Sequence, residues 1–169
     1  MTEPESVQAL VRELAEAALD IVINNAGQGE NRSAPPAFED WRSIFATNSL
    51  APAWLAAALK DNLLAGQQKK LVTITSQLGS ITNHTGGLHA YHASKAAVNS
   101  FMRGLALEWR TLGISVGLFH PGWVQTDMGG QSAPTTPAQS VTGLRQRIAE
   151  LNLENSGTFR DFEDRILPW

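Results

Sequence analysis

The chain has 169 residues, of which 43% are hydrophobic and 17% charged, with a formal net charge of −3 at pH 7. At roughly 100–200 residues per domain this length predicts one domain, and the composition is too apolar for a disordered chain. The acidic balance gives no reason to expect nucleic-acid binding or binding to anionic lipid. Because the chain has no cysteine, disulfides, thiolate zinc sites and thiol nucleophiles are excluded. An acidic beginning and a longest apolar run of only Leu50–Leu59 predict a cytoplasmic protein without signal peptide or membrane span.

Helix and strand patterns alternate along the first half of the chain, which favours an α/β fold with a parallel sheet. A helix is expected over Glu3–Leu19, where apolar residues follow one helical face and Thr2 and Glu5 have capping-box spacing. The short β-branched run Ile21–Ile23 lacks alternation, as expected for a strand buried on both faces. The next elements are a loop over Gln28–Ala37 and a helical stretch over Phe38–Leu64 that Pro52 should kink or restart.

The second half of the chain continues this alternation. We expect, in order, a strand over Leu71–Thr75 that opens at Ser76, a polar loop over Gln77–Ala90, a helix over Tyr91–Leu112 capped by Gly113, a strand over Ser115–Phe119, a loop over Pro121–Pro137, a helix from Thr136 to about Asn152, and a last strand over Thr158–Phe162. The Pro121–Pro137 loop is long enough to suggest a functional lid rather than a connector.

Two residues at the start of the predicted Tyr91–Leu112 helix have the spacing of an acid/base pair. Tyr91, the only tyrosine, stands four positions before Lys95, so both side chains project from one helical face. A lysine ammonium beside a phenol favours the phenolate and lowers its pKa. Such a pair can give a proton to a carbonyl oxygen or remove one from an alcohol. An ordinary surface pair is the alternative.

Ser76 and Asn48 are further candidates on local grounds. Ser76 lies where a parallel strand should emerge at its carboxyl end, the edge at which open α/β sheets bind ligands. Asn48 lies four residues before Pro52, whose missing N–H frees the carbonyl of Asn48 to hold a water. The alternatives are a serine that simply ends a strand and a loose turn between two helices.

Together these residues form an ordered set of motifs. The set comprises Asn24-Asn25-Ala26-Gly27 after a strand, Asn48, Ser76, Tyr91-His92-Ala93-Ser94-Lys95, and Pro121-Gly122-Trp123-Val124-Gln125-Thr126. In this order and spacing it strongly resembles the short-chain dehydrogenase/reductase family over nearly the whole chain. Within that family it is most similar to the C-factor-like and Sniffer-like carbonyl reductase branch, through the run His120–Gly130 and the ending from Ser156 to Trp169.

The resemblance implies a Rossmann-type, doubly wound parallel sheet and hydride transfer between NAD or NADP and a small carbonyl or alcohol substrate. It implies that Tyr91 is the general acid/base, that Lys95 lowers its pKa and binds the nicotinamide ribose, and that Ser76 orients the substrate carbonyl. Asn48 would hold a water of a proton relay through its backbone. The implied cofactor contacts are Asn25, Ala26, Gly27, Tyr91, Lys95, Pro121, Gly122, Val124 and Thr126, with Asp127–Pro137 as the substrate lid.

The sequence departs from the family at its beginning. Members open with a strand and a glycine-rich turn that lets a helix N-terminus approach the cofactor pyrophosphate, and two further βα units follow. This sequence shows none of these, and Gly27-Gln28-Gly29 is no substitute because no helix opens directly after it. We therefore expect an N-terminally truncated Rossmann-type domain over residues 1–169, with the Ile21–Ile23 strand at an open apolar edge.

This beginning is compatible with a misassigned gene start, a fragment or a genuine short form. Shortened C-factor-like proteins are associated with cell–cell signalling, so the alternative to an enzyme is a non-catalytic signalling or binding protein that keeps the fold. Family members commonly dimerise through the helices carrying Asn48 and Tyr91, which implies a homo-oligomer, a dimer or a tetramer. The residue that separates NAD from NADP is not in this sequence, so the choice of cofactor stays open, as does the substrate.

Three histidines, His84, His89 and His92, lie close together in the sequence and suggest a metal site. No nearby carboxylate or cysteine completes one. We therefore expect no metal, and a polar loop near the substrate pocket instead.

Overall fold

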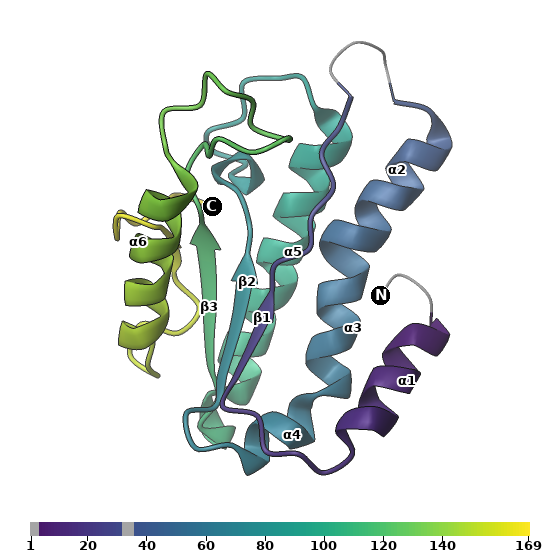
Figure 1. Ribbon diagram of the computed structural model, residues 1–169, viewed down its shortest axis with the longest axis vertical. Helices are drawn as coiled ribbons and strands as arrows, with labels where there is room; N and C mark the ends of the chain where they lie inside the picture. Colours follow the sequence, from purple (N-terminus) through teal and green to yellow (C-terminus); the bar gives the residue numbers. More distant parts are fainter. Residues whose placement is uncertain (1–3, 32–35) are drawn as a thin grey trace.

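Parallel strands form the centre of the fold in the computed structural model, which describes residues 4–31 and 36–169. The sheet of this described part has the order β1-β2-β3-β4 (Figure 1), and all neighbouring strands are parallel. The strands are β1 (Ile21–Asn24), β2 (Lys70–Ile74), β3 (Ser115–His120) and β4 (Phe159–Asp161). The helices are α1 (Pro4–Leu14), α2 (Phe38–Phe45), α3 (Ala51–Ala58), α4 (Lys60–Ala65), α5 (His89–Glu108) and α6 (Pro137–Glu150). The predicted α/β class and parallel sheet are confirmed.

Helices cover both faces of the sheet, with α6 on one side and α2, α3 and α5 on the other (Figure 1). Leu71 and Leu118 of the central strands point into the larger core cluster, with α3, α4 and α5. Their neighbours Val72 and Phe119 point to the opposite face and pack with residues of α6. This two-sided burial explains why β2 and β3 show no regular alternation of apolar and polar residues. The expectation of burial on both faces is wrong for β1, where Ile21 and Val22 are half-buried and Ile23 is exposed.

The first helix ends at Leu14, five residues before the predicted end at Leu19. Ala15 has a φ of 43°, which breaks the helix. The side-chain amide of Asn62 in α4 donates to the carbonyl oxygens of Ala15 and Ala17, each at 2.9 Å. A long-range hydrogen-bond partner therefore holds a turn where the apolar periodicity favoured more helix. The predicted capping residue Thr2 lies outside the described residues.

Pro52 divides the long helical stretch, as predicted. Helix α2 runs into a π-helical turn, η1 (Ala46–Leu50), before α3 begins, and α4 follows after Leu59. Because Pro52 has no N–H, it cannot bond the carbonyl oxygen of Asn48 as an α-helical residue would. We attribute the wider turn to this missing donor, since π turns arise where the regular bonding of a helix is interrupted. The turn places Asn48 in the interior of the protein.

The other predicted elements occur close to their expected positions. Helix α5 begins two residues early, at His89, and passes at Trp109–Leu112 into the 3₁₀ turn η3, which ends at Gly113 with a φ of 76°. At the start of α6, the side chain of Thr136 accepts from the Gln139 N–H while Gln139 accepts from the Thr136 N–H, which completes the predicted capping box.

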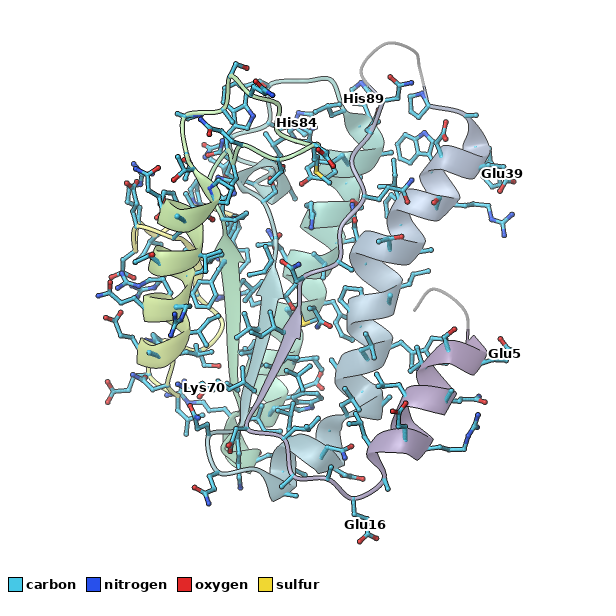
Figure 2. The ribbon with its side chains drawn as sticks, viewed as in Figure 1. Glu5, Glu16, Glu39, Lys70, His84 and His89 are labelled. Carbon is cyan, nitrogen blue, oxygen red and sulfur yellow. The ribbon has the colours of Figure 1, made fainter. Side chains whose placement is uncertain are left out.

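Helix α6 is anchored to the sheet at its C-terminal end. The ammonium of Lys70, at the start of β2, donates to the carbonyl oxygens of Ile148 and Ala149 at 2.8 and 2.9 Å. These oxygens belong to the last turn of the helix, where a positive charge is favourable. Figure 2 shows Lys70 at one end of the sheet and His84 and His89 beyond the other end, where the strands finish.

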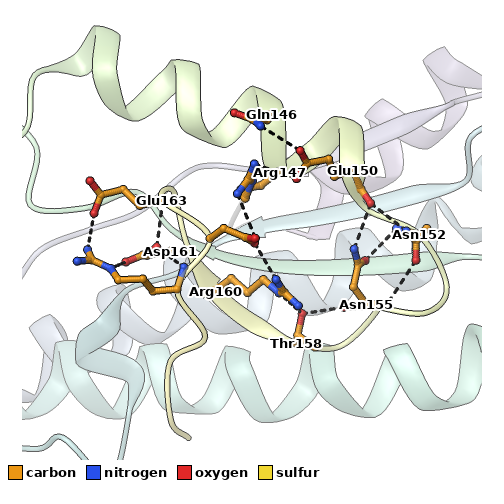
Figure 3. Close-up of polar contacts among 11 residues, drawn as sticks. Gln146, Arg147, Glu150, Asn152, Asn155, Thr158, Arg160, Asp161 and Glu163 are labelled. Carbon is orange, nitrogen blue, oxygen red and sulfur yellow. Dashed lines mark hydrogen bonds and ion pairs between the residues drawn. The ribbon is translucent and has the colours of Figure 1, made fainter.

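A network of charged and polar side chains fastens α6 to β4 and the segment that follows (Figure 3). Arg147 pairs with Glu150 at 2.8 Å and with Asp164 at 3.3 Å. The buried carboxylate of Asp161 accepts from the Arg165 guanidinium at 2.6 Å. The segment after β4 is therefore held beside the carboxyl ends of the strands, where it borders the site described below.

Strand β1 forms one edge of the described sheet, since it pairs with β2 only. Ile23 on this edge is 50% exposed, so the expectation of an open apolar edge is confirmed for the residues that the structure describes. No helix among those residues is long and apolar enough to cross a membrane.

Candidate active site

The carboxyl ends of β1, β2 and β3 meet at one edge of the sheet. Three predicted segments lie at or just after the ends of these strands: Asn24–Gly27, which begins with the last residue of β1, Ser76 shortly after β2, and Pro121-Gly122 after β3. Helix α5 begins at the same edge and carries Tyr91 and Lys95 in its first turns. The parallel topology therefore gathers residues separated by almost one hundred positions, at the edge where open α/β sheets bind ligands.

Tyr91 and Ser76 meet through a hydrogen bond between their side chains. The hydroxyl oxygen of Ser76 also accepts from the Leu78 N–H at 3.2 Å, which fixes its direction at the start of the 3₁₀ turn η2 (Gln77–Gly79). Burial raises the pKa of Tyr91 above its ordinary value of 10.0, and the hydrogen bond with Ser76 acts in the opposite direction. At neutral pH this tyrosine carries its proton.

Lys95 lies one helical turn after Tyr91 and is 4% exposed. Its ammonium donates to the carbonyl oxygen of Ile74 at 3.2 Å and lies 5.8 Å from the centre of the Tyr91 ring. Burial lowers the pKa of Lys95 to about 8. A cation with so little water around it is ready to interact with any polar group that enters the site.

The structure corrects the expectation that the pKa of Tyr91 is lowered. Tyr91 and Lys95 share one poorly hydrated environment, which disfavours the phenolate and the ammonium alike. Removal of water from the phenol is the largest cause of the shift, and Lys95 is not among the groups that move the pKa of Tyr91. The site presents a protonated phenol, which is an acid, rather than a phenolate base.

Asn48 uses its whole side chain to join three segments. Its amide oxygen accepts from the Gln28 N–H at 2.7 Å, and its amide nitrogen donates to the Gln28 carbonyl oxygen at 2.9 Å. The same nitrogen donates to the Ser94 hydroxyl at 3.0 Å. The loop after β1, the π turn and helix α5 are thus linked through one buried side chain.

The loop after β1 reaches this centre at Gly27. A Cβ on residue 27 would lie 3.7 Å from the Lys95 ammonium nitrogen and 3.8 Å from the Asn48 amide oxygen. Asn25, Ala26 and Gly27 are all exposed. Gly27 therefore borders Lys95, and all three residues are open to solvent.

The segment after β3 is the one predicted to act as a lid. Pro121 is held by the Ser140 hydroxyl, which donates to its carbonyl oxygen at 2.6 Å, and Gly122 has a φ of 88° that favours glycine. Val124 pairs with Thr135 in an isolated bridge, which closes the lid on itself. Thr126 is exposed, and its hydroxyl accepts from the Gly129 N–H at 3.2 Å.

The lid reaches across to the loop after β1. Met128 packs against Gly29 so closely that a Cβ on residue 29 would lie 3.2 Å from Met128 Cγ. The residues predicted to contact a cofactor thus come from two loops that touch one another. Val124 and Thr126 belong to the segment after β3, where Val124 is half-buried and Thr126 is exposed.

A cleft of about 540 Å³ opens beside Ser76, between η2, the lid and the segment after β4. Sequence reasoning missed several of its lining residues, including His120, Phe162 and Arg165. Arg165 carries a positive charge, but it pairs with Asp161 and Glu163 at 2.6 Å each. The segment after β4 lies in the stretch Ser156–Trp169 that carries the family resemblance, but no single residue of it was predicted to be a site residue.

His120 is a buried neutral side chain in the lining of this cleft. Burial lowers the pKa of His120 to about 4, although the carboxylate of Asp161 acts to raise it. Its Nδ1 is buried without a hydrogen-bond partner among the described residues. The cleft therefore offers little net charge to a ligand.

His84 and His89 lie together at this end of the molecule (Figure 2), and His92 lies beside His84. The ring centres of His84 and His92 are 4.2 Å apart, and those of His84 and His89 are 6.3 Å apart. Burial lowers the pKa of His92, with further lowering by His84 and His89. Across the described ranges, no group of three or more histidine, cysteine or acidic side chains is arranged to hold a metal ion.

Comparison with protein-family models matches residues 1–137 to the short chain dehydrogenase model. The chain belongs to the short-chain dehydrogenase/reductase family. The C-signal protein of Myxococcus xanthus is 36% identical to it over 166 residues, which cover 96% of this chain and 100% of that protein.

Solved structures of family members resemble the fold closely. The NADPH-bound carbonyl reductase from chicken fatty liver has a TM-score of 0.90 and 30% identity, covering 99% of this chain and 74% of that one. The carbonyl reductase Sniffer of D. melanogaster has a TM-score of 0.88 and 29% identity, covering 98% and 72%. The expected likeness to both the C-factor-like and the Sniffer-like branch is confirmed.

The burial of Lys95 gives a stability prediction. Its pKa is about 8 in the folded protein against 10.5 when unfolded, so the unfolded chain binds more protons between these values and stability rises with pH there. Below about pH 8 the full cost of burying the cation is present. A Lys95→Met variant, which is apolar and of similar length, should therefore raise the free energy of unfolding at pH 7, by the order of 1–3 kcal/mol.

Urea denaturation of wild type and Lys95→Met at pH 7 and pH 10 measures this effect. The advantage of the variant should shrink at pH 10, where the wild-type lysine is largely neutral in the folded state. Lys69→Met, which replaces a lysine that is not buried, serves as the control. A Lys95→Met variant that is less stable than wild type by the same amount at both pH values would contradict the prediction.

Proposed function

We propose that the chain is an NAD(P)-dependent oxidoreductase that interconverts a carbonyl and an alcohol. The observation that carries this proposal is the buried group of Ser76, Tyr91 and Lys95 at the carboxyl edge of the sheet. The groups needed to protonate a carbonyl oxygen are all present: a protonated phenol, a hydroxyl hydrogen-bonded to it and a cation beneath the ring. The solved relatives described above are carbonyl reductases, which supports the same reaction class.

The residues around Gly27 suit the nicotinamide half of a dinucleotide. The Lys95 ammonium has three N–H donors, and among the described residues it makes one hydrogen bond, to the carbonyl oxygen of Ile74. The remaining donors are available to ribose hydroxyls on the side of Gly27. When bound, the nicotinamide supplies or accepts the hydride. The residues that would hold it are Asn25, Ala26, Gly27, Tyr91 and Lys95, with Pro121, Gly122, Val124 and Thr126 from the lid side.

The proton steps follow from the protonation states. In reduction, the Tyr91 hydroxyl donates its proton to the carbonyl oxygen, and the Ser76 hydroxyl hydrogen-bonds the same oxygen. The Lys95 ammonium then stabilises the phenolate that remains. In oxidation Tyr91 takes the alcohol proton and must first be deprotonated, so its raised pKa favours reduction at neutral pH.

Asn48 is proposed to extend this path to solvent through its backbone. Its side chain is fully occupied by Gln28 and Ser94, so only the backbone carbonyl is available for such a role. Pro52 leaves that carbonyl without its α-helical donor. The carbonyl can therefore hold a water that passes a proton toward Lys95.

A second candidate is a non-catalytic signalling or binding protein that keeps this fold. It is favoured by the C-signal protein, whose whole length the chain covers, whereas the chain covers 74% of the NADPH-bound carbonyl reductase. The two candidates differ in whether the folded chain binds a dinucleotide productively.

Self-association is proposed as well, as a dimer or tetramer. Large apolar side chains of η1, α3 and α5 are exposed, with Leu50 at 63%, Trp54 at 38%, Phe101 at 41% and Leu107 at 69%. A second copy that covers these side chains would remove them from water, which is favourable. Such a surface lies on helices that also carry Asn48 and Tyr91, so association would brace the site.

Replacing Tyr91 by phenylalanine tests the catalytic proposal. The variant keeps the ring but loses the proton donor, so turnover should fall at least about 100-fold, while the thermal melt stays close to wild type. The assay is oxidation of NADH or NADPH with a panel of aldehydes and ketones. Ser100→Ala, an exposed position on the same helix, is the control. Full activity in Tyr91→Phe would remove Tyr91 from the mechanism.

A Phe101→Glu variant tests the self-association. A charge at the centre of an apolar contact is strongly unfavourable, so sedimentation velocity should show wild type as a dimer or larger and the variant as a monomer. Circular dichroism would establish that both are folded. A monomeric wild type, or a variant that associates as wild type does, would contradict this proposal.

A further inference from the structure

The catalytic helix α5 begins without a cap of its own. Its N-cap residue Leu88 is in the left-handed region, with φ and ψ of 45°, and has no side chain that accepts a hydrogen bond. The first turn contains no acidic residue. The first N–H groups of any helix lack intrahelical partners, and a carboxylate is the group that best satisfies them.

A carboxylate from a distant part of the chain fills this role. Glu30, in the loop after β1, accepts a hydrogen bond from the Tyr91 N–H at 2.9 Å across 61 positions of sequence. Glu30 is half-buried. It also acts electrostatically on His92, the next residue of the helix, whose pKa it acts to raise. The negative charge therefore lies directly over the positive end of α5.

The same loop holds the other side of Tyr91 through a chain of hydrogen bonds. The Asn48 side chain hydrogen-bonds both the N–H and the carbonyl oxygen of Gln28, and it donates to the Ser94 hydroxyl. The Ser94 hydroxyl in turn donates to the Tyr91 carbonyl oxygen at 2.8 Å. Both backbone polar groups of Tyr91 are thus connected to the segment Gln28–Glu30. The N–H is bonded directly to Glu30, and the carbonyl oxygen is linked to Gln28 through Ser94 and Asn48.

We propose that Glu30 is a positioning residue for Tyr91, which caps the catalytic helix from the loop that borders the cofactor position. The loop that holds Glu30 also carries Gly27 beside Lys95 and Gly29 beneath Met128 of the lid. The position of that loop therefore determines where the Tyr91 hydroxyl lies and in which direction it points. Loss of the carboxylate lets the first turn of α5 fray and moves the proton donor away from the substrate oxygen.

This inference rests on the proposed function for its catalytic part, so its test has two independent readouts. Steady-state kinetics gives kcat and KM, and hydrogen exchange monitored by NMR gives the protection of the Tyr91 amide. The variants are Glu30→Ala, which removes the acceptor, and Glu30→Gln, which keeps an oxygen acceptor without the charge. Glu16→Ala, an exposed position after α1, is the matched control, and thermal melts are recorded for all.

In Glu30→Ala, kcat should fall about 10-fold or more, since small misplacements of a reacting group are costly, while KM for the dinucleotide changes less than about twofold. The Tyr91 amide should exchange about 10-fold faster, as the free energy of one charge-assisted hydrogen bond implies. Glu30→Gln should recover most of both losses. A general loss of stability would instead speed exchange throughout α5.

An unchanged Tyr91 exchange rate in Glu30→Ala would overturn the proposal, whether or not the chain has activity. Wild-type kcat in Glu30→Ala, or a Glu30→Gln variant as impaired as Glu30→Ala in both readouts, would also overturn it. If wild type itself shows no turnover, the proposed function fails. The exchange comparison then still decides whether Glu30 holds Tyr91 in place.

Discussion

The hydrogen bonds of the Asn48 side chain are the interactions on which the rest of the site depends. The side chain connects the loop after β1, through Gln28, to the catalytic helix, through Ser94, and it does so from inside a turn of another helix. An asparagine in a regular helix competes with the backbone for hydrogen bonds. Here Pro52 interrupts the helix four residues later, and the π turn directs the amide inward. Without this turn, no single side chain would connect the loop after β1 to α5.

A second constraint is the shortage of water around Tyr91 and Lys95. The same burial raises the pKa of the phenol and lowers that of the ammonium to about 8. It keeps the proton donor loaded at neutral pH, and it makes the cation costly to the folded state. The large core cluster of α3, α4, α5 and the central strands stabilises the fold around this unfavourable group. The buried charge thus lowers the stability of the fold, but it lies where its interaction with a reacting oxygen would be strongest.

Much of the fold could be predicted from the sequence, because strands buried on both faces and amphipathic helices have distinct patterns. The strands at Ile21, Leu71, Ser115 and Phe159, the capping box at Thr136 and the gathering of Ser76, Tyr91 and Lys95 were all expected. The early end of α1 was not, since it depends on Asn62, which is distant in sequence. The raised pKa of Tyr91 was also not expected, because burial of a side chain depends on the whole fold rather than on its neighbours in the helix.

The same limit applies to the residues that surround the centre. Glu30 reaches the helix across 61 positions, and Phe162 and Arg165 border the cleft from a segment in which no site residue was predicted. Each acts through tertiary contacts that no local spacing encodes. Sequence motifs pointed to the residues that are proposed to carry chemistry, whereas the structure was needed to find the residues that hold them.

The central claim is that this site binds a nicotinamide dinucleotide, and fluorescence titration of the purified chain with NADH and NADPH tests it most directly. The account predicts saturable binding by wild type and its loss in a folded Tyr91→Phe/Lys95→Ala double variant. Absence of binding by a wild-type chain that melts cooperatively would contradict the account and favour the non-catalytic alternative.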